Sequence, residues 1–355
     1  MADVPFLDEV ETQPQVLRGL AQAYQGPWRE PLARAAELLK GKPLTLFFGM
    51  GSSYHAGMIA ATRLAGAGRA AFAEDASELL HYRMGLLREP VALVAISQSG
   101  ESAETCRVAQ ERPAGTPLVA ITNDPESSLA RSADLVLPLL AGPEVGTSNK
   151  TYLASIAIGL LLASSVLGEE ESAYGALPQV IDGVEEALVV AHREAPAIVD
   201  HWEAAGPAGS LIAVGRGPAH ATALQAALIL KEMTGVHVEG LSAGMFRHGP
   251  VELAGSGTIF IIFAPAGRTS ALLQGLVADL NAWNSRLWIV TDEENEARFR
   301  NLGANAVVTV LPHVPEEWAA ITSIVPVELA SAELARRRGL VPGQLRKTPK
   351  VTSRE

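Results

Sequence analysis

Short apolar runs alternate with longer helix-like stretches along most of the chain. Each run has the length of a buried strand and ends in a turn, which is mostly followed by a helical pattern. Four runs fall in the first half, at Leu44 to Phe48, Val91 to Ile96, Leu118 to Ile121 and Leu135 to Leu139. Four more fall in the second half, at Leu211 to Val214, Thr258 to Phe263, Leu287 to Val290 and Ala306 to Leu311. This alternation predicts an α/β fold in which parallel sheets carry helices on both faces.

The two halves repeat in register. Gly215 follows Gly49 by 166 residues, and Gly267 follows Gly100 by 167. A constant spacing of this kind predicts a duplicated α/β unit. We therefore expect a first domain over residues 1–176 that includes an N-terminal helical segment, a bridging helix over 177–205, and a second domain with the C-terminal tail over 206–355.

Hydroxyl-bearing turns lie where the strands of the first half should end. Gly49-Met50-Gly51-Ser52-Ser53 and Ser97-Gln98-Ser99-Gly100-Glu101-Ser102 each follow an apolar run, and Gly146-Thr147-Ser148-Asn149-Lys150 opens the apolar stretch from Tyr152 to Leu167. One serine-rich turn is usually a helix cap. Three of them, at strand ends or helix starts, favour a shared site for an oxyanion such as phosphate.

The second half has lost these hydroxyls. Ala264-Pro265-Ala266-Gly267 stands where the first half has Ser97-Gln98-Ser99-Gly100. Gly215-Arg216-Gly217 stands in place of Gly49-Met50-Gly51 and lacks the third small residue of a dinucleotide-binding loop, because His220 occupies that position. We therefore expect one phosphate site per chain, in the first domain, and no NAD.

Composition narrows the possible partners. A hydrophobic share of 48% in 355 residues fits a globular chain of about two domains, and a net charge of −11 argues against nucleic acid. The single cysteine, Cys106, excludes an internal disulfide framework and fits a reducing cytoplasm. The stretch Tyr152 to Leu167 is shorter than a membrane span, so we expect a buried helix there and no membrane partner. No histidine and carboxylate spacing indicates a metal site.

Five motifs occur in the order seen in sugar isomerase (SIS) domain proteins: GMGSSYHA, SQSGES, AGPEVGTSNKTY, LILKE and FRHGP. The chain resembles the isomerase half of the glutamine:fructose-6-phosphate aminotransferase family. The resemblance implies two tandem SIS domains of flavodoxin-like or Rossmann-like fold, a phosphosugar substrate and no cofactor. It also implies a homodimer with a shared active site.

The same resemblance implies the site residues. The sugar phosphate would be held by Gly51, Ser52, Ser53, Ser97, Gln98, Ser99 and Ser102, and Ser148 would reach the sugar. Glu232 would move the proton between C1 and C2. His248, donated by a neighbouring subunit, would open the sugar ring. Lys350 would contact the open-chain carbonyl, and Lys347 is the alternative tail lysine.

The chain departs from the synthase pattern at Gln225, Ile229 and Met245, where that pattern has Glu, Lys and Glu. Ala2 stands where the synthase has its glutaminase cysteine, so we expect no release of ammonia from glutamine. The expected function is a phosphosugar isomerase acting on fructose 6-phosphate, glucosamine 6-phosphate or a close relative. The alternatives are an aminosugar-phosphate deaminase, a fructosamine-phosphate deglycase, and a non-catalytic phosphosugar sensor.

Overall fold

The computed structural model describes residues 5–204, 206 and 210–352. The chain forms two compact units. The N-terminal unit is Thr12–Pro178 with Arg346–Glu355, and the C-terminal unit is Gln179–Leu345 with Met1–Glu11. Ala2 and the outer limits of the predicted domains, residues 1, 205 and 355, lie outside the described residues. The predicted domain bounds stay a prediction.

The N-terminal unit contains a parallel sheet in the order β2-β1-β3-β4-β5. Its strands are β1 (Leu44–Gly49), β2 (Ala70–Asp75), β3 (Val91–Ser97), β4 (Leu118–Thr122) and β5 (Leu135–Pro138). Its helices are α2 (Gln13–Gln25), α3 (Arg29–Lys40), α4 (Ser52–Gly66), α5 (Ala76–Glu78), α6 (Ala103–Glu111), α7 (Ser128–Ser132) and α8 (Lys150–Leu167). The helix α9 (Glu170–Glu203) begins in this unit and continues into the other.

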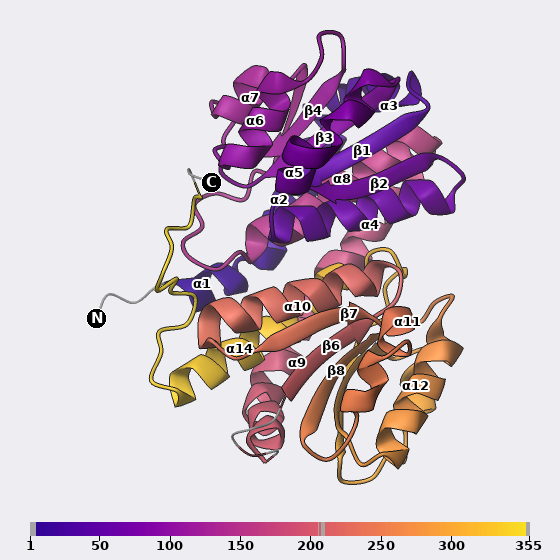
Figure 1. The fold of residues 1–355 in the computed structure, drawn as a ribbon, viewed down its shortest axis with the longest axis vertical. Helices are drawn as coiled ribbons and strands as arrows, with labels where there is room; N and C mark the ends of the chain where they lie inside the picture. Colours follow the sequence, from indigo (N-terminus) through magenta and orange to yellow (C-terminus); the bar gives the residue numbers. More distant parts are fainter. Residues whose placement is uncertain (1–4, 205, 207–209, 353–355) are drawn as a thin grey trace. The chain divides into compact units, whose positions relative to one another are not determined.

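Helices cover both faces of this sheet (Figure 1). Leu46 and Phe48 of β1 pack with Cys106 and other residues of α6. Phe47 points to the opposite face, where a Cβ placed on Gly57 of α4 would lie 3.3 Å from the Phe47 Cβ. Successive side chains of a strand alternate between faces, so β1 is buried on both sides, as expected for a parallel sheet.

The apolar helix α8 lies in the core of the N-terminal unit. By length and composition it could cross a membrane, and 94% of its span is buried. It packs against α2, α3 and α4, which cover it within the unit. The apolar stretch that the sequence predicts as a buried helix is therefore used for internal packing.

The C-terminal unit contains a second parallel sheet, in the order β7-β6-β8-β9-β10. Its strands are β6 (Ser210–Gly215), β7 (Val238–Ser242), β8 (Thr258–Ala264), β9 (Arg286–Asp292) and β10 (Ala306–Leu311). Its helices, besides most of α9, are α1 (Phe6–Glu11), α10 (Pro218–Thr234), α11 (Ala243–Phe246), α12 (Ser270–Ala282), α13 (Ala319–Ser323) and α14 (Val325–Arg337). The predicted α/β class with parallel sheets is confirmed, and both sheets have the same strand order.

The first residues of the chain belong to the C-terminal unit. Phe6 of α1 is fully buried, and α1 packs against α14. Gly343 adopts φ of 77°, and a Cβ placed on it would lie 2.5 Å from the Phe6 Cβ. Gly343 thus provides both the left-handed backbone and the space that Phe6 needs.

Candidate functional site

The turns after β1 and β3 lie next to each other at the carboxyl edge of the N-terminal sheet (Figure 1). A Cβ on Gly49, the last residue of β1, would lie 2.6 Å from the carbonyl oxygen of Ile96 in β3. Only glycine allows the two strand ends to approach this closely. In the order 2-1-3-4-5 these strands meet at the topological switch point, where open α/β sheets bind ligands.

Two helices begin at this edge. Gly51, with φ of 51°, precedes the first residue of α4, Ser52, and Ser53 is the next residue of the helix. Ser102 precedes α6. The amino ends of two helices, with their positive dipole ends, therefore lie beside the turn hydroxyls. Such an arrangement suits an anion without requiring a basic side chain.

Local hydrogen bonds set the shape of the turn Ser97–Ser102. The Ser97 hydroxyl accepts from the Gly100 N–H at 3.1 Å and lies 3.4 Å from the Ser102 hydroxyl. The Ser99 hydroxyl accepts from the Glu101 N–H at 3.1 Å. Gly100 has φ of 65°, and a Cβ there would lie 2.0 Å from the Ser127 Oγ, so no other residue fits. Gln98 follows Ser97 in this turn and is half-buried.

Cys106 lies directly beneath the same turn. Its thiol donates to the Gly100 carbonyl oxygen at 3.2 Å. Burial and, to a smaller extent, the nearby Glu101 carboxylate raise the pKa of this thiol to about 11, against the opposing effect of Arg131. The thiol is a packing group that supports the turn, since its charged form is disfavoured.

The third hydroxyl-bearing turn is held by Glu144, which the sequence analysis did not single out. The Glu144 side chain is fully buried and accepts from the N–H groups of Asn149 at 3.0 Å and Thr151 at 2.9 Å. It also accepts from the Thr151 hydroxyl at 2.7 Å. Ser148 lies within this turn, with its hydroxyl 3.1 Å from that of Thr151. Glu144 is part of the AGPEVGTSNKTY motif, but nothing in the local pattern indicates its partner.

That partner is the tail lysine. Lys350 Nζ donates to Glu144 Oε2 at 2.7 Å across 206 residues of sequence. Two residues further on, the carbonyl oxygen of Thr352 accepts from the N–H of Ala103, the first residue of α6. Lys347 is exposed. The tail therefore carries Lys350, and not Lys347, to the turn of Ser148 and to the start of α6.

The other two predicted catalytic residues belong to the C-terminal unit. Glu232 is a half-buried residue of α10, three and seven residues beyond Ile229 and Gln225, both fully buried. These three positions share one face of the helix. His248 is exposed and follows α11, with its backbone N–H donating to the Met245 carbonyl oxygen at 3.0 Å. Within the N-terminal unit, the structure brings together the predicted phosphate residues, Ser148 and Lys350, whereas Glu232 and His248 lie in the C-terminal unit.

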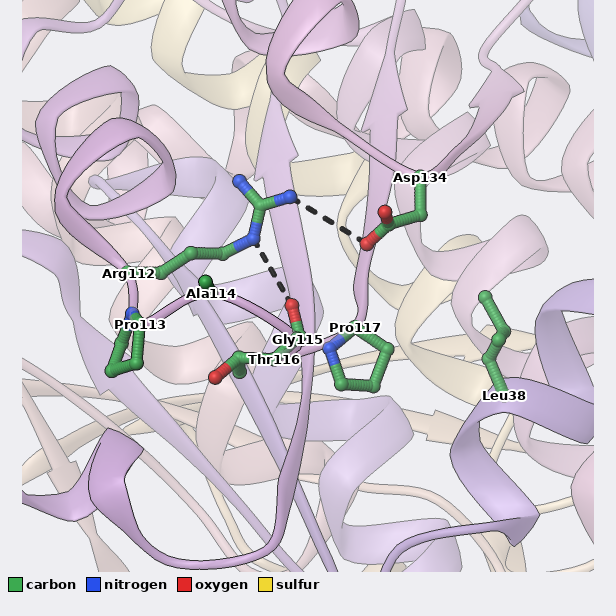
Figure 2. Close-up of a pocket in the computed structure, with 8 residues that line it drawn as sticks. All are labelled: Leu38, Arg112, Pro113, Ala114, Gly115, Thr116, Pro117 and Asp134. Atoms are coloured by element: carbon green, nitrogen blue, oxygen red, sulfur yellow. Dashed lines mark hydrogen bonds and ion pairs between the residues drawn. The ribbon is translucent and has the colours of Figure 1, made fainter.

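A pocket of about 410 Å³ lies elsewhere in the N-terminal unit. It is lined by Leu38, Arg112, Pro113, Ala114, Gly115, Thr116, Pro117 and Asp134 (Figure 2). The pocket borders the first residue of β4, Leu118, whose N–H donates to Asp134, so it lies at the amino edge of the sheet. Its Arg112 side chain already contacts the Thr116 carbonyl oxygen at 3.1 Å and Asp134 at 3.5 Å. We therefore place the candidate site at the carboxyl edge, where the hydroxyl turns and Lys350 meet.

Among the described residues, no group of three or more His, Cys, Asp or Glu side chains is placed to hold a metal ion. The chemistry available at the carboxyl edge includes turn hydroxyls, backbone N–H groups, the Lys350 amine and the buried Glu144 carboxylate.

The SIS domain family model matches residues 38–165 and 207–336. The chain belongs to the SIS domain family. The resemblance found in the motifs is thereby confirmed, and each matched stretch contains one of the two sheets.

Full-length relatives extend beyond this chain. It is 30% identical to the glutamine–fructose-6-phosphate aminotransferase [isomerizing] of Zymomonas mobilis over 98% of this chain and 58% of that protein. It is 31% identical to the enzyme of the same name from Pyrococcus horikoshii, over 99% of this chain and 58% of that protein. The chain thus spans less than two thirds of the length of these relatives.

The fold also matches a solved structure. The C-terminal domain of glucosamine-fructose-6-phosphate aminotransferase from Francisella tularensis superimposes with a TM-score of 0.84 at 23% identity, covering 96% of this chain and 98% of that one.

Proposed function

We propose that the chain is a cofactor-independent isomerase of ketose and aldose sugar 6-phosphates, acting on fructose 6-phosphate, glucosamine 6-phosphate or a close relative. The observation that carries the proposal is the meeting of the hydroxyl turns after β1 and β3 with Lys350 at one edge of a single sheet. The turns provide a place for a phosphate dianion, and the lysine provides a cation for a carbonyl group of the same ligand.

The proposed reaction needs a carbonyl activator and a proton-transfer group. Lys350 would polarise the C2 carbonyl of the open-chain ketose or form a Schiff base with it, which makes the C1 proton easier to remove. With the carbonyl polarised by Lys350, Glu232 would take the C1 proton as the C1–H electron pair forms a C1–C2 double bond and the C2=O π pair moves to O2, which gains a proton. O1 would then lose its proton as C1=O forms, and the C1–C2 π pair would take the proton from Glu232 at C2. His248 would transfer the proton needed for ring opening. The names of the relatives, which are aminotransferases with an isomerizing activity, support the proposed class of reaction.

The test is turnover of a defined panel: fructose 6-phosphate, glucose 6-phosphate, glucosamine 6-phosphate and a fructosamine 6-phosphate. Solvent deuterium incorporation at C1 or C2, followed by NMR, reports isomerisation, and a coupled ammonia assay reports deamination or deglycation. We expect isomerisation with at least one sugar. Binding without any turnover would contradict the proposal and favour a phosphosugar sensor.

Glu232→Gln is the sharpest variant for the chemical step. It should lower kcat by about 10²- to 10⁴-fold while the phosphosugar Kd stays nearly unchanged, because a general acid/base is removed without loss of a binding group. Glu239→Gln, at an exposed position of β7, is the control for loss of one carboxylate in the same unit. Equal effects of the two variants would remove Glu232 from the mechanism.

The two tail lysines form a matched pair for the carbonyl step. Lys350→Ala should abolish borohydride trapping of a fructose 6-phosphate adduct, or lower kcat if the lysine only polarises the carbonyl. Lys347→Ala should leave both measurements unchanged, because Lys347 is exposed and Lys350 is held by Glu144. The reverse result would assign the role to Lys347.

We further propose a cytoplasmic homodimer in which His248 acts in the site of the partner subunit. Mixing inactive Glu232→Gln and His248→Ala chains under exchange conditions should restore part of the activity, because some mixed dimers contain one intact site. No restored activity, in a mixture shown to exchange subunits, would place His248 in the site of its own chain.

A further inference from the structure

The turn after β8 is the structural counterpart of the turn after β3. A single shift of 167 residues superimposes β3 on β8 and the first residue of α6, Ala103, on the first residue of α12, Ser270. Gly100 then corresponds to Gly267. The C-terminal unit therefore has a turn of the same length between β8 and α12, with Ala264 and Ala266 in place of Ser97 and Ser99 and Thr269 in place of Ser102. Both strand-to-helix connections can be followed in Figure 1.

Oxygens of the chain itself occupy the N–H groups of this second turn. The N–H of Ala266 donates to Asp292 Oδ2 at 2.7 Å, and that of Gly267 donates to the Ser270 hydroxyl at 3.0 Å. The N–H of Arg268 donates to Glu316 Oε2 at 3.1 Å. Three successive backbone donors ahead of a 13-residue helix are thus satisfied, two of them by carboxylates from other parts of the unit.

The Glu316 carboxylate lies against the backbone of Gly267. A Cβ placed on Gly267 would lie 2.1 Å from Glu316 Cδ and 2.5 Å from each of its oxygens. In the first turn, the space beside Gly100 is filled instead by the Ser127 hydroxyl. The described hydrogen bonds of Ser97 to Ser102 show no carboxylate from another element on a backbone N–H of that turn.

The turn before α12 favours the negative charge of a carboxylate for the same reason that it would favour a phosphate. The amino end of α12 has a positive dipole end, and successive backbone N–H groups form a concave anion-binding surface. A carboxylate supplied by the chain is present at a very high effective concentration and competes with any anion from solution.

We infer that the Glu316 carboxylate is the resident anion of the C-terminal unit's turn, and that it restricts phosphate binding to the N-terminal unit. Glu316 is on this reading a specificity-determining residue that keeps one phosphosugar per chain. The inference rests on the proposed phosphate site after β1 and β3, and it explains why a duplicated fold has a single such site.

Glu316→Ala tests this directly. Equilibrium dialysis with labelled inorganic phosphate should give about one bound phosphate per wild-type chain and about two per variant chain, the second weaker because Ala264 and Ala266 replace the Ser97 and Ser99 hydroxyls. Glu317→Ala removes the same charge one residue away and should stay at the wild-type stoichiometry. Glu316→Ala combined with Gly267→Ala places a methyl group in the vacated space and should return binding to about one.

The outcomes separate the inference from the function it rests on. A folded Glu316→Ala chain that binds only one phosphate, or a wild-type chain that binds two, overturns the inference. A wild-type chain that binds no phosphate or phosphosugar refutes the proposed function instead. If the variant does not fold, crystals of the unaltered chain grown in sulfate decide: we expect sulfate at Ser97–Ser102 only, and sulfate replacing Glu316 on the Arg268 N–H would overturn the inference.

Discussion

The environment of the Cys106 side chain is determined by the turn that lies above it. Its thiol is buried, donates to the Gly100 carbonyl oxygen and belongs to α6, the helix that begins directly after Ser102. The pKa of about 11 means that only a very small fraction is thiolate near neutral pH, and thiolate is the reactive form.

We therefore expect Cys106 to react slowly with a thiol reagent such as DTNB at pH 8 in the folded protein, and rapidly after unfolding in urea. The folded-state pKa lies above the unfolded value of 9.0, so the thiol's contribution to stability is complete below pH 9 and is lost as the pH rises toward 11. Absorbance at fixed pH follows the labelling, with Cys106→Ser as the blank. Immediate labelling of the native chain would contradict the buried, protonated thiol.

Local pattern was enough to predict where the hydroxyl-bearing turns lie. Ser97, Ser99 and Ser102 follow a run of apolar residues, and a strand end followed by a helix start is visible in the sequence. Glu144 was missed because its role depends on Lys350, 206 residues away, and no local spacing encodes that contact. Long-range pairs of this kind become visible only when the fold brings them together.

At the scale of elements, eight apolar runs were found, including those of the edge strands β5 and β10, and the edge strands β2 and β7 were not. β2 is only partly buried and ends in Glu-Asp, and β7 contains Glu239 and Gly240. β2 and β7 therefore lack the apolar run by which the sequence predicts a buried strand. The order of the strands in each sheet could not be predicted from the sequence, because it depends on which connecting segment crosses the sheet.

The close approach of α4 and α8 links packing to the candidate site. A Cβ on Gly159 of α8 would lie 3.1 Å from the Ala60 Cβ of α4, the helix that starts at Ser52. Gly159→Val should overpack this contact, cost about 1 to 3 kcal/mol and displace α4 together with Ser52 and Ser53. We expect a lower Tm and a weaker phosphosugar Kd, measured by thermal unfolding and calorimetry.

The control is Gly175→Val, at an exposed position of α9 where an added Cβ would meet no atom within 4 Å. It should leave both measurements nearly unchanged. A Gly159→Val chain with a lowered Tm and an unaltered Kd would show that the start of α4 does not contribute to binding.

At the scale of the whole molecule, the chain's two ends are exchanged between the units. Phe6→Ala should therefore destabilise the C-terminal unit, by about 3 to 5 kcal/mol for a fully buried phenylalanine. Hydrogen exchange should accelerate in α14, which packs against α1, and not in β1 to β5. Asp8→Ala, at an exposed position of the same helix, should change neither. Faster exchange confined to the N-terminal unit would contradict this assignment of the first residues.

The exchanged ends limit how the protein can be dissected. A fragment that stops at Pro178 would lose the lysine held by Glu144, and a fragment that starts at Gln179 would lose the aromatic ring beneath Gly343. Each end of the polypeptide thus completes the packing of the unit formed mainly by the other half of the chain. Expression of either half alone would yield a unit that lacks its terminal segment. To express a complete unit, the coding sequence of that segment would have to be fused to the coding sequence of the distant half.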